Sequence, residues 1–338
     1  MLTAMRFRSI AVAAATVVVL AGCSGGDSTT TPDPDPSQRD AADLVQLSPL
    51  TGLEMTSTPQ NPVFVVKIEN TYGGEPQIAL DQADLVVEEL VEGGLTRLAA
   101  MYYSTIPSKV GHVRSLRATD IGVASPVNGA IVASGGAGNA VRRVERAGIT
   151  VFSEDAGSPG FSSDPALVRP YNRLIDLTTL AAKARVTAPP SPFLPFTAEG
   201  ETADPGTSKT RSGIRTATVR FSRSTSTSWK LGAKDQWSRT NGHADKEFRA
   251  DNLVIMYCRI GDAGYTDPAG NPVPVTELEG SGRAIVLHGS DAVELTWKKP
   301  ALDSPITFET ADGTPYTLDP GHTFLELVPK DDGKVTLN

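Results

Sequence analysis

Two arginines that flank a short serine-containing run, Arg114-Ser115-Leu116-Arg117, are the residues best suited to bind an anion. The run is typical of a loop that enters a helix, with Ser115 as the N-cap. Free backbone N–H groups and the helix dipole favour anions at such a position, and guanidinium groups strengthen this preference. We therefore predict a carboxylate or phosphate site here. The open alternative is that the arginines pair with neighbouring glutamates or Asp120 and lock adjacent elements together.

A third arginine, Arg97, belongs to a β-rich stretch that spans residues 84–103 and is divided by a double glycine at 93–94. A double glycine favours a two-residue hairpin turn. Pairing that counts outward from this turn sets Arg97 opposite Leu90 and diagonally between Glu88 and Glu92. The sequence thus predicts a hairpin with two glutamates and one arginine on the same face.

Glu88 and Glu92 are the candidates for acid and base catalysis. In glycoside cleavage the two catalytic carboxyl groups lie about 5 to 9 Å apart, a range that residues two apart on one strand face satisfy. Many purely structural pairs have the same spacing. Catalysis by these glutamates is therefore an alternative to ligand binding, and an enzymatic role stays open, with non-enzymatic binding favoured.

A glycine-rich turn, with Ser134, Gly135 and Gly136, links a predicted strand at 129–133 to a predicted helix that runs through Arg146. Such turns can cradle phosphates, so the three residues join the candidate ligand-binding set. The run lacks the third glycine of a dinucleotide fingerprint and the Gly-Lys-Ser/Thr of a P-loop. We expect a tight turn and no cofactor.

Metal and nucleophile chemistry have no clustered candidates in the sequence. The four histidines are scattered, and neither a Gly-x-Ser-x-Gly elbow nor a Ser-x-x-Lys motif occurs. We therefore predict no metal site. Cys258 ends an apolar run from Leu253 and is expected to be a buried strand residue.

The N-terminus has the pattern of an export signal. Arg6 and Arg8 precede an uncharged apolar run from Ile10 to Leu20, which is shorter than the roughly 20 apolar residues of a membrane span. The string that ends in Cys23 resembles a lipobox, which implies cleavage after residue 22 and a lipid on Cys23. Residues 23–43 are polar and proline-rich, and we expect a disordered tether. The predicted location is the outer face of a bacterial cytoplasmic membrane, with attachment through that lipid.

Charge narrows the possible partners. The chain has 31 basic and 39 acidic residues, and removal of Arg6 and Arg8 leaves 29 against 39, a net charge of −10. An acidic surface is repelled by nucleic acids and anionic lipids. We expect no nucleic-acid partner; a cell-wall or envelope-protein partner remains possible.

The elements that must position these side chains indicate an α+β fold. We predict a mixed α/β layered sandwich over residues 44–187, beginning with a strand at 63–69, and a β-rich region over 214–338. The proline-rich residues 188–213 between them are predicted to be a connection.

Motifs along both regions resemble those of the YerB-like bacterial lipoprotein family. The matching runs are Ser48-Pro49-Leu50-Thr51-Gly52, Val66-Lys67-Ile68-Glu69-Asn70, Val91-Glu92-Gly93-Gly94-Leu95-Thr96-Arg97, Gly111-His112-Val113-Arg114-Ser115-Leu116-Arg117 and Trp237-Ser238-Arg239-Thr240-Asn241-Gly242. The run Arg169-Pro170-Tyr171-Asn172 resembles a Pro-His-Asn segment of the family, and it adds Asn172 to the candidate ligand-binding residues. The resemblance implies layered sheets, an envelope location and unknown biochemistry, and it supplies no catalytic residue.

Three functions follow as hypotheses. The first is an envelope lipoprotein that binds an anionic or polar ligand, or a partner protein, through the arginines and the glycine-rich turn. The second is a cell-wall hydrolase or transferase that uses Glu88 or Glu92. The third is a structural or assembly role, which would leave the arginines internally paired and an apolar patch exposed.

Overall fold

The computed structural model describes residues 46–186, 188–198 and 201–338. The predicted signal peptide, Cys23 and the tether lie outside these residues. Within the described ranges, no helix combines the length and the apolar character needed to cross a membrane. Residues Val45–Asn338 form one compact unit.

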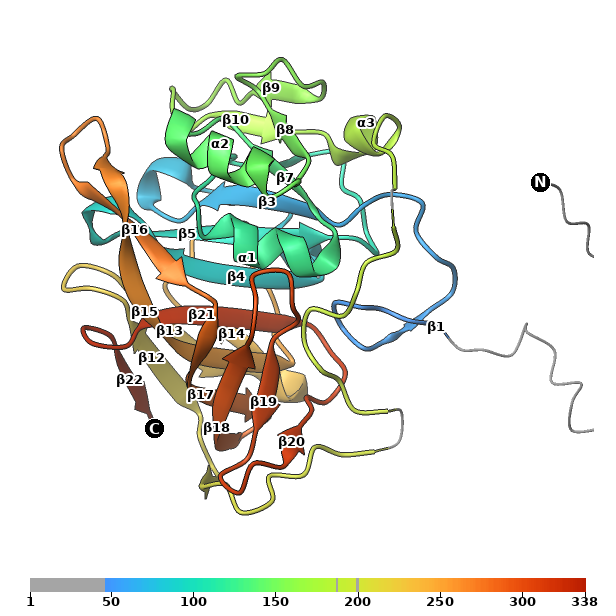
Figure 1. The fold of residues 1–338 in the computed structure, drawn as a ribbon, viewed down its shortest axis with the longest axis vertical. Helices are drawn as coiled ribbons and strands as arrows, with labels where there is room; N and C mark the ends of the chain where they lie inside the picture. The colour runs from blue at the N-terminus through green and yellow to red at the C-terminus, as the bar shows by residue number, and fades with distance from the viewer. Residues whose placement is uncertain (1–45, 187, 199–200) are drawn as a thin grey trace, which may run out of the picture. The chain divides into compact units, whose positions relative to one another are not determined.

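A long mixed sheet joins both halves of the sequence (Figure 1). From one edge to the other its strands are β20 (Pro315–Tyr316), β19 (Thr307–Glu309), β18 (Asp291–Lys299), β17 (Gly280–His288), β15 (Asn252–Thr266), β21 (Thr323–Pro329), β4 (Leu85–Leu90), β5 (Thr96–Tyr102), β3 (Phe64–Glu69), β7 (Ala130–Ala133) and β8 (Val151–Ser153). In addition, β11 (Thr210–Arg211) pairs with β18 and β16 (Pro272–Glu277) pairs with β15.

Smaller sheets and short helices complete the described part. A four-stranded sheet has the order β14 (Trp237–Arg239), β13 (Ser226–Leu231), β12 (Thr216–Arg220) and β22 (Lys334–Leu337). A three-stranded sheet contains β6 (Val110–Gly111), β10 (Arg173–Ile175) and β9 (Phe161–Ser163), and β1 (Gln46–Leu47) pairs with β2 (Glu54–Met55). The helices are α1 (Asp120–Ala124), α2 (Gly138–Arg146) and α3 (Leu177–Ala181), with 3-10 turns at Tyr72–Gly74, Leu80–Gln82, Glu92–Gly94, Ser125–Val127 and Ala233–Asp235.

Strand β21 connects the two halves, because it runs parallel to β4 on one side and to β15 on the other. Figure 1 shows the red β21 directly beside the teal β4. Residues before and after the proline-rich segment therefore share one sheet. That segment is itself partly built into the core, since Phe193 and Leu194 are fully buried.

Alternating side chains divide the core into two clusters on opposite faces of the long sheet. One face packs on α1 and α2 through residues such as Val123 and Val144. The other packs on the four-stranded sheet, where Trp229 and Trp237 are buried. Alternate residues of a strand point to opposite faces, so the register decides which core each charged side chain enters.

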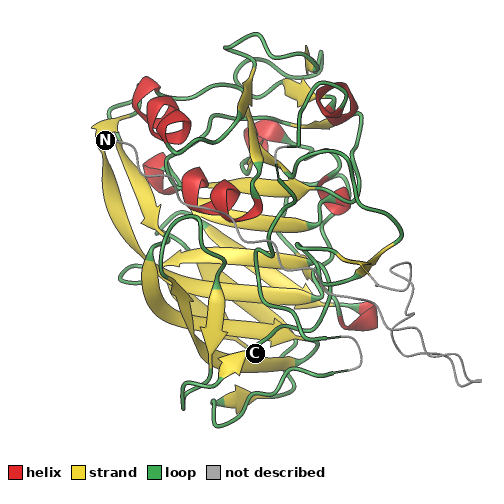
Figure 2. Ribbon diagram, turned by 45° about the vertical axis from the view of Figure 1, so that its right-hand side comes forward, coloured by secondary structure: helices red, strands yellow, loops and turns green. Residues whose placement is uncertain are grey.

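The fold is mixed but dominated by strands, as Figure 2 shows, and the second half is β-rich as predicted. The predicted α/β layered sandwich in the first half is not confirmed. The strand at 63–69, the hairpin at 84–103, the strand at 129–133 and the helix through Arg146 are present as β3, β4 with β5, β7 and α2. Cys258 is a buried residue of β15, as predicted.

The predicted hairpin register is wrong by one residue. Glycines 93 and 94 both have positive φ, near 70°, and belong to a 3-10 turn inside a five-residue loop, 91–95, rather than to a two-residue turn. Arg97 consequently lies opposite Glu89 instead of Leu90. A slip of one residue exchanges the faces of a strand, so Glu88 and Arg97 point to opposite sides of the sheet.

The predicted helix start at Ser115 is also wrong, because α1 begins at Asp120. The backbone before it bonds to neighbouring segments instead: the N–H of Arg114 donates to the Lys67 carbonyl at 2.9 Å, and the N–H of Leu116 donates to the Gly135 carbonyl at 3.0 Å. These tertiary hydrogen bonds replace the bonds that a helical turn would have made. The anion site cannot therefore rest on a helix N-terminus at Ser115.

Candidate functional site

Arg97 and Arg114 converge on one carboxylate, Glu69 of β3. The Nη1 of Arg97 lies 2.9 Å from Glu69 Oε1, and Arg114 binds the other oxygen of the same carboxylate. Arg97 is only 4% exposed, and burial, together with the charge of Arg117, lowers its pKa to about 10. Two arginines are thus held by one fully buried glutamate.

Arg117 holds the hairpin loop through a two-pronged bond to Glu92. Its Nε lies 2.9 Å from Glu92 Oε2, and its Nη2 binds the other oxygen. Burial disfavours the charged form of both side chains. The hydrogen bond with Glu92 and the charge of Glu92 outweigh burial and raise the pKa of Arg117, and the hydrogen bond with Arg117 lowers the pKa of Glu92. The pair fastens the loop between β4 and β5 to the segment before α1.

Behind these arginines lies a buried triad of Lys67, Glu89 and Asp120. Lys67 Nζ binds Glu89 and lies 2.7 Å from Asp120 Oδ1, and all three side chains are at most 1% exposed. Burial alone would lower the pKa of Lys67, but the charges of Asp120 and Glu89 outweigh burial and raise it. Burial raises the pKa of Glu89 to about 7. The triad joins β3, β4 and the start of α1.

The glycine-rich turn lies beside the Arg114 segment, since the Ser134 N–H donates to the Arg114 carbonyl at 3.0 Å. At Gly135, φ is 154°, and an added Cβ would lie 1.7 Å from the Asp155 carboxylate, so the position requires glycine. Tight packing thus explains this glycine; Gly136 follows it in the same turn.

Asn172 lies next to Tyr171, whose ring is 4.9 Å from the Arg114 guanidinium, and the Oδ1 of Asn172 is buried without a hydrogen-bond partner. The predicted ligand-binding residues Arg114, Ser115 and Ser134 lie close together. Arg97 shares the Glu69 carboxylate with Arg114, whereas Arg117 binds a different carboxylate, that of Glu92. Their role in binding a ligand stays a prediction.

The two candidate catalytic glutamates do not come together. Glu92 pairs with Arg117, whereas Glu88 points to the opposite face of the sheet and is fully buried. Glu88 nevertheless forms part of the wall of a cavity of about 300 Å³, which we call the hairpin pocket. The hairpin pocket is lined by Asn70, Thr71, Tyr72, Glu88, Leu95, Ser224, Thr225, Ser226, Thr227, Arg239, Asn241 and His243.

Arg239 organises the wall of the hairpin pocket. Its guanidinium donates to Glu247 at 2.8 Å, to the Asn70 side-chain oxygen at 3.0 Å and to the Gln77 side-chain oxygen at 2.6 Å. It is 5% exposed, so these bonds are shielded from competition by water. The pocket wall is therefore a fixed polar network that joins β3 to β14.

Two carboxyl groups lie side by side at this wall, because Glu88 on β4 pairs in register with Glu326 on β21. Thr227 Oγ1 lies 3.0 and 2.9 Å from the two Glu88 oxygens, and Trp229 Nε1 donates to Glu326 at 2.6 Å. Burial raises the pKa of both groups, and the Glu88 charge raises that of Glu326 further. Two neighbouring buried carboxylates repel each other, which favours the protonated form of one of them.

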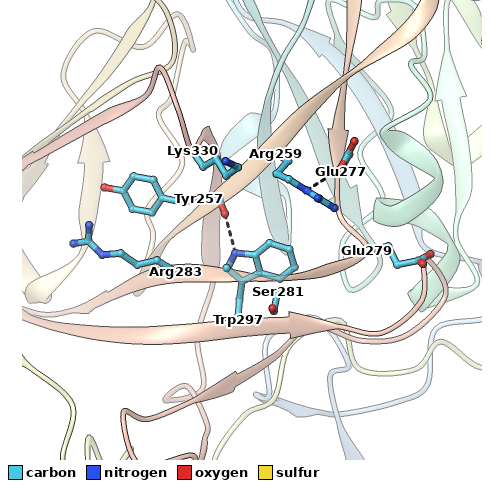
Figure 3. A pocket seen from close by; sticks show the side chains of 9 residues that line it. Tyr257, Arg259, Glu277, Glu279, Ser281, Arg283, Trp297 and Lys330 are labelled. Atoms are coloured by element: carbon cyan, nitrogen blue, oxygen red, sulfur yellow. Dashed lines mark hydrogen bonds and ion pairs between the residues drawn. The ribbon is translucent and has the colours of Figure 1, made fainter.

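A second cavity, of about 340 Å³, opens where β15 separates from β17 (Figure 3). At its base the indole N–H of Trp297 donates to the Tyr257 carbonyl at 3.0 Å. Its three cationic residues are largely exposed, and each has a carboxylate partner 2.8 to 3.5 Å away. This cavity lacks the buried polar anchors of the hairpin pocket. It is lined by Tyr257, Arg259, Glu277, Glu279, Ser281, Gly282, Arg283, Trp297 and Lys330.

Sequence reasoning missed hairpin-pocket residues such as Tyr72, Thr227 and Arg239. It also missed Glu326, the neighbour of Glu88. One signal was available for Glu326, which interrupts the apolar run Phe324-Leu325-Glu326-Leu327-Val328 and so required a buried partner. Arg239 and Asn241 lie in a motif that carried the family resemblance. For Tyr72 no signal existed, because only the fold brings it to a cavity.

Across 46–186, 188–198 and 201–338, no group of three or more histidine, cysteine or acidic side chains is arranged to hold a metal ion.

Comparison with known proteins identifies similar chains. The models of the "Protein of unknown function (DUF3048)" N-terminal and C-terminal domains match residues 50–189 and 217–325. A relative named "Putative lipoprotein YerB", from Bacillus subtilis (strain 168), is 24% identical over 297 residues, covering 83% of this chain and 86% of the relative. The crystal structure of the YerB protein from Bacillus subtilis matches with a TM-score of 0.70 at 20% identity, covering 86% of this chain and 99% of that one. The two structures share a fold.

Proposed function

The chain belongs to the YerB-like family, whose two domains are described as DUF3048, and from that premise we propose that it is a lipid-anchored envelope protein that binds a small polar ligand in the hairpin pocket. The observation that carries the proposal is the pocket itself. A cavity of about 300 Å³ is at the lower end of small-molecule sites, and its polar lining is held rigid by the buried Arg239 network.

Binding without catalysis is the activity that this geometry supports best. Glu88 has no contact with water, and its two oxygens already accept hydrogen bonds from Thr227 and Asn70. A general acid or base must reach the proton that it transfers. In this proposal Glu88 therefore holds Thr227 and Asn70 in place, and a ligand contacts the hydroxyl-bearing lining of the pocket.

Filling the pocket is expected to abolish ligand binding. Thr71 lines the cavity and precedes the 3-10 turn Tyr72–Gly74 without a side-chain cap bond, so Thr71→Trp should occupy the cavity at little cost to the fold. We expect a ligand found by thermal-shift screening of neutral sugars, anionic sugars and short peptides to lose at least about tenfold in affinity, or about 1.4 kcal/mol. Thr336→Trp, on the exposed face of β22, is the matched control.

The same screen tests the predicted arginine site. A ligand that loses affinity for the Arg114→Ala, Arg117→Ala double variant but keeps it for Thr71→Trp would place binding at the arginines and contradict the pocket. Unchanged affinity for both variants would contradict both sites.

The anchor has its own test. In a bacterial host that lipidates its exported proteins, the chain is expected to partition into the detergent phase of Triton X-114, and Cys23→Ser is expected to stay in the aqueous phase, because two acyl chains give stable attachment. Cys258→Ser is the control, since that thiol is buried in β15. Equal partitioning of the chain and Cys23→Ser would refute lipid anchoring at this residue.

A further inference from the structure

Tyr72 is a large aromatic side chain that the fold leaves in water. It is 81% exposed, at the rim of the hairpin pocket, and its ring meets the His243 ring edge-on with centroids 4.6 Å apart. His243 is held in turn by a hydrogen bond with Glu75. An exposed aromatic ring that is fixed from one side offers its free surface to a ligand.

Hydroxyl groups form another part of the pocket lining. The run Ser224-Thr225-Ser226-Thr227 contributes four consecutive hydroxyl-bearing residues to the lining. A free hydroxyl can donate one hydrogen bond and accept others, and Thr227, which already donates to Glu88, can still accept. Such a surface matches a ligand that is itself rich in hydroxyl groups. Leu95, which is 38% exposed, adds an apolar contact beside them.

Charges around the pocket are matched before any ligand arrives. Arg239 pairs with Glu247 at 2.8 Å, and Glu88, which forms part of the pocket wall, lies within the field of Arg239. A charged ligand would therefore find no unmatched countercharge among these lining residues, and it would lose hydration without compensation. The pocket favours a neutral ligand.

We propose that the ligand of the hairpin pocket is a neutral sugar, whose apolar ring face stacks on Tyr72 while its hydroxyl groups bond to residues 224–227. A sugar ring combines an apolar face with a hydroxyl-bearing edge, and the pocket lining combines an exposed aromatic ring with a run of hydroxyl groups. The proposal rests on the proposed function, since it names the ligand class of the same pocket.

Calorimetry with the purified chain tests the sugar class directly. The probes are maltose, cellobiose and N,N′-diacetylchitobiose as neutral sugars, glucuronic acid and glucose 6-phosphate as anionic sugars, and triglycine as a peptide. We expect at least one neutral disaccharide to bind. Tyr72→Ala should then weaken binding about tenfold or more, whereas Tyr72→Phe, which keeps the ring, should stay within about threefold.

The outcomes separate this inference from the proposed function. If only an anionic sugar or the peptide binds, and Thr71→Trp blocks it, the sugar proposal fails and the pocket remains a binding site. Equal affinities of Tyr72→Ala and the unmodified chain for a neutral sugar would also overturn the stacking role. If Thr71→Trp abolishes the binding of none of the probes, both proposals fail.

Discussion

Replacement of Lys67 by methionine is expected to lower the free energy of unfolding by roughly 3 to 5 kcal/mol, the usual cost of breaking a buried ion pair from one side. Lys67 is the cation that Glu89 and Asp120 share, and all three are shielded from water. Methionine has a similar length and fills the space, so the loss arises from two carboxylates left without their counterion.

Urea denaturation at pH 7 measures this effect. The triple variant Lys67→Met, Glu89→Gln, Asp120→Asn should recover much of the lost stability, because both carboxylates are then neutral. Lys298→Met, at a surface pair with Glu309, is the matched control and should change stability by no more than about 1 kcal/mol. A loss below about 1 kcal/mol for Lys67→Met would show that the triad does not hold β3, β4 and α1 together.

The second large effect is a dependence of stability on pH that originates in buried glutamates. The pKa values of Glu88, Glu89 and Glu326 are raised by burial, that of Glu89 to about 7, from an ordinary value of 4.5. Between the ordinary and the raised pKa, the folded chain holds protons that the unfolded chain has released. The contribution of these groups to the free energy of unfolding is therefore complete below about pH 4.5. It falls as the pH rises toward 7 and beyond, by up to about 1.4 kcal/mol per pH unit for each group.

Glu326→Gln should reduce the steepness of this fall, because it removes one of the two carboxyl groups that compete for a proton. Glutamine can still accept the hydrogen bond from Trp229 Nε1. The measurement is a set of urea unfolding curves between pH 5 and 8. Glu277→Gln, at a half-exposed surface pair, is the control. An identical pH slope for the unmodified chain and Glu326→Gln would exclude a shared proton at this pair.

Local patterns were sufficient to predict elements but not their register. The alternation of residues 84–103 and the double glycine identified the hairpin, because both signals lie within twenty residues. The length of the loop depended on the backbone of the two glycines, which both adopt positive φ in a five-residue loop. That single difference moved Glu88 from the predicted face with Arg97 to the face of the hairpin pocket.

The arginine cluster was predictable in part, because some of its ion-pair partners lie close together in the sequence. Residues 111–120 and 84–103 are close enough in sequence for ion pairs between them to be anticipated, and Arg117 does bind Glu92. The partner of Arg97 and Arg114 is Glu69 on β3, which no local pattern indicated. Likewise Asn70, Glu88, Thr227, Arg239 and Glu326 meet only after five strands have assembled.

The position of β21 has a consequence for how the chain reaches its folded state. It is the last strand of the long sheet in sequence order, yet it lies between β4 and β15, in the middle of that sheet. Until residues 323–329 have been synthesised, β4 and β15 both present open edges, and pairing β21 with β4 closes a loop of more than two hundred residues. The closing step is thus non-local and should be slow, and a nascent chain short of β21 is exposed to wrong strand pairing. Glu326 arrives with this strand, so the proton-sharing pair comes into being only in the finished molecule.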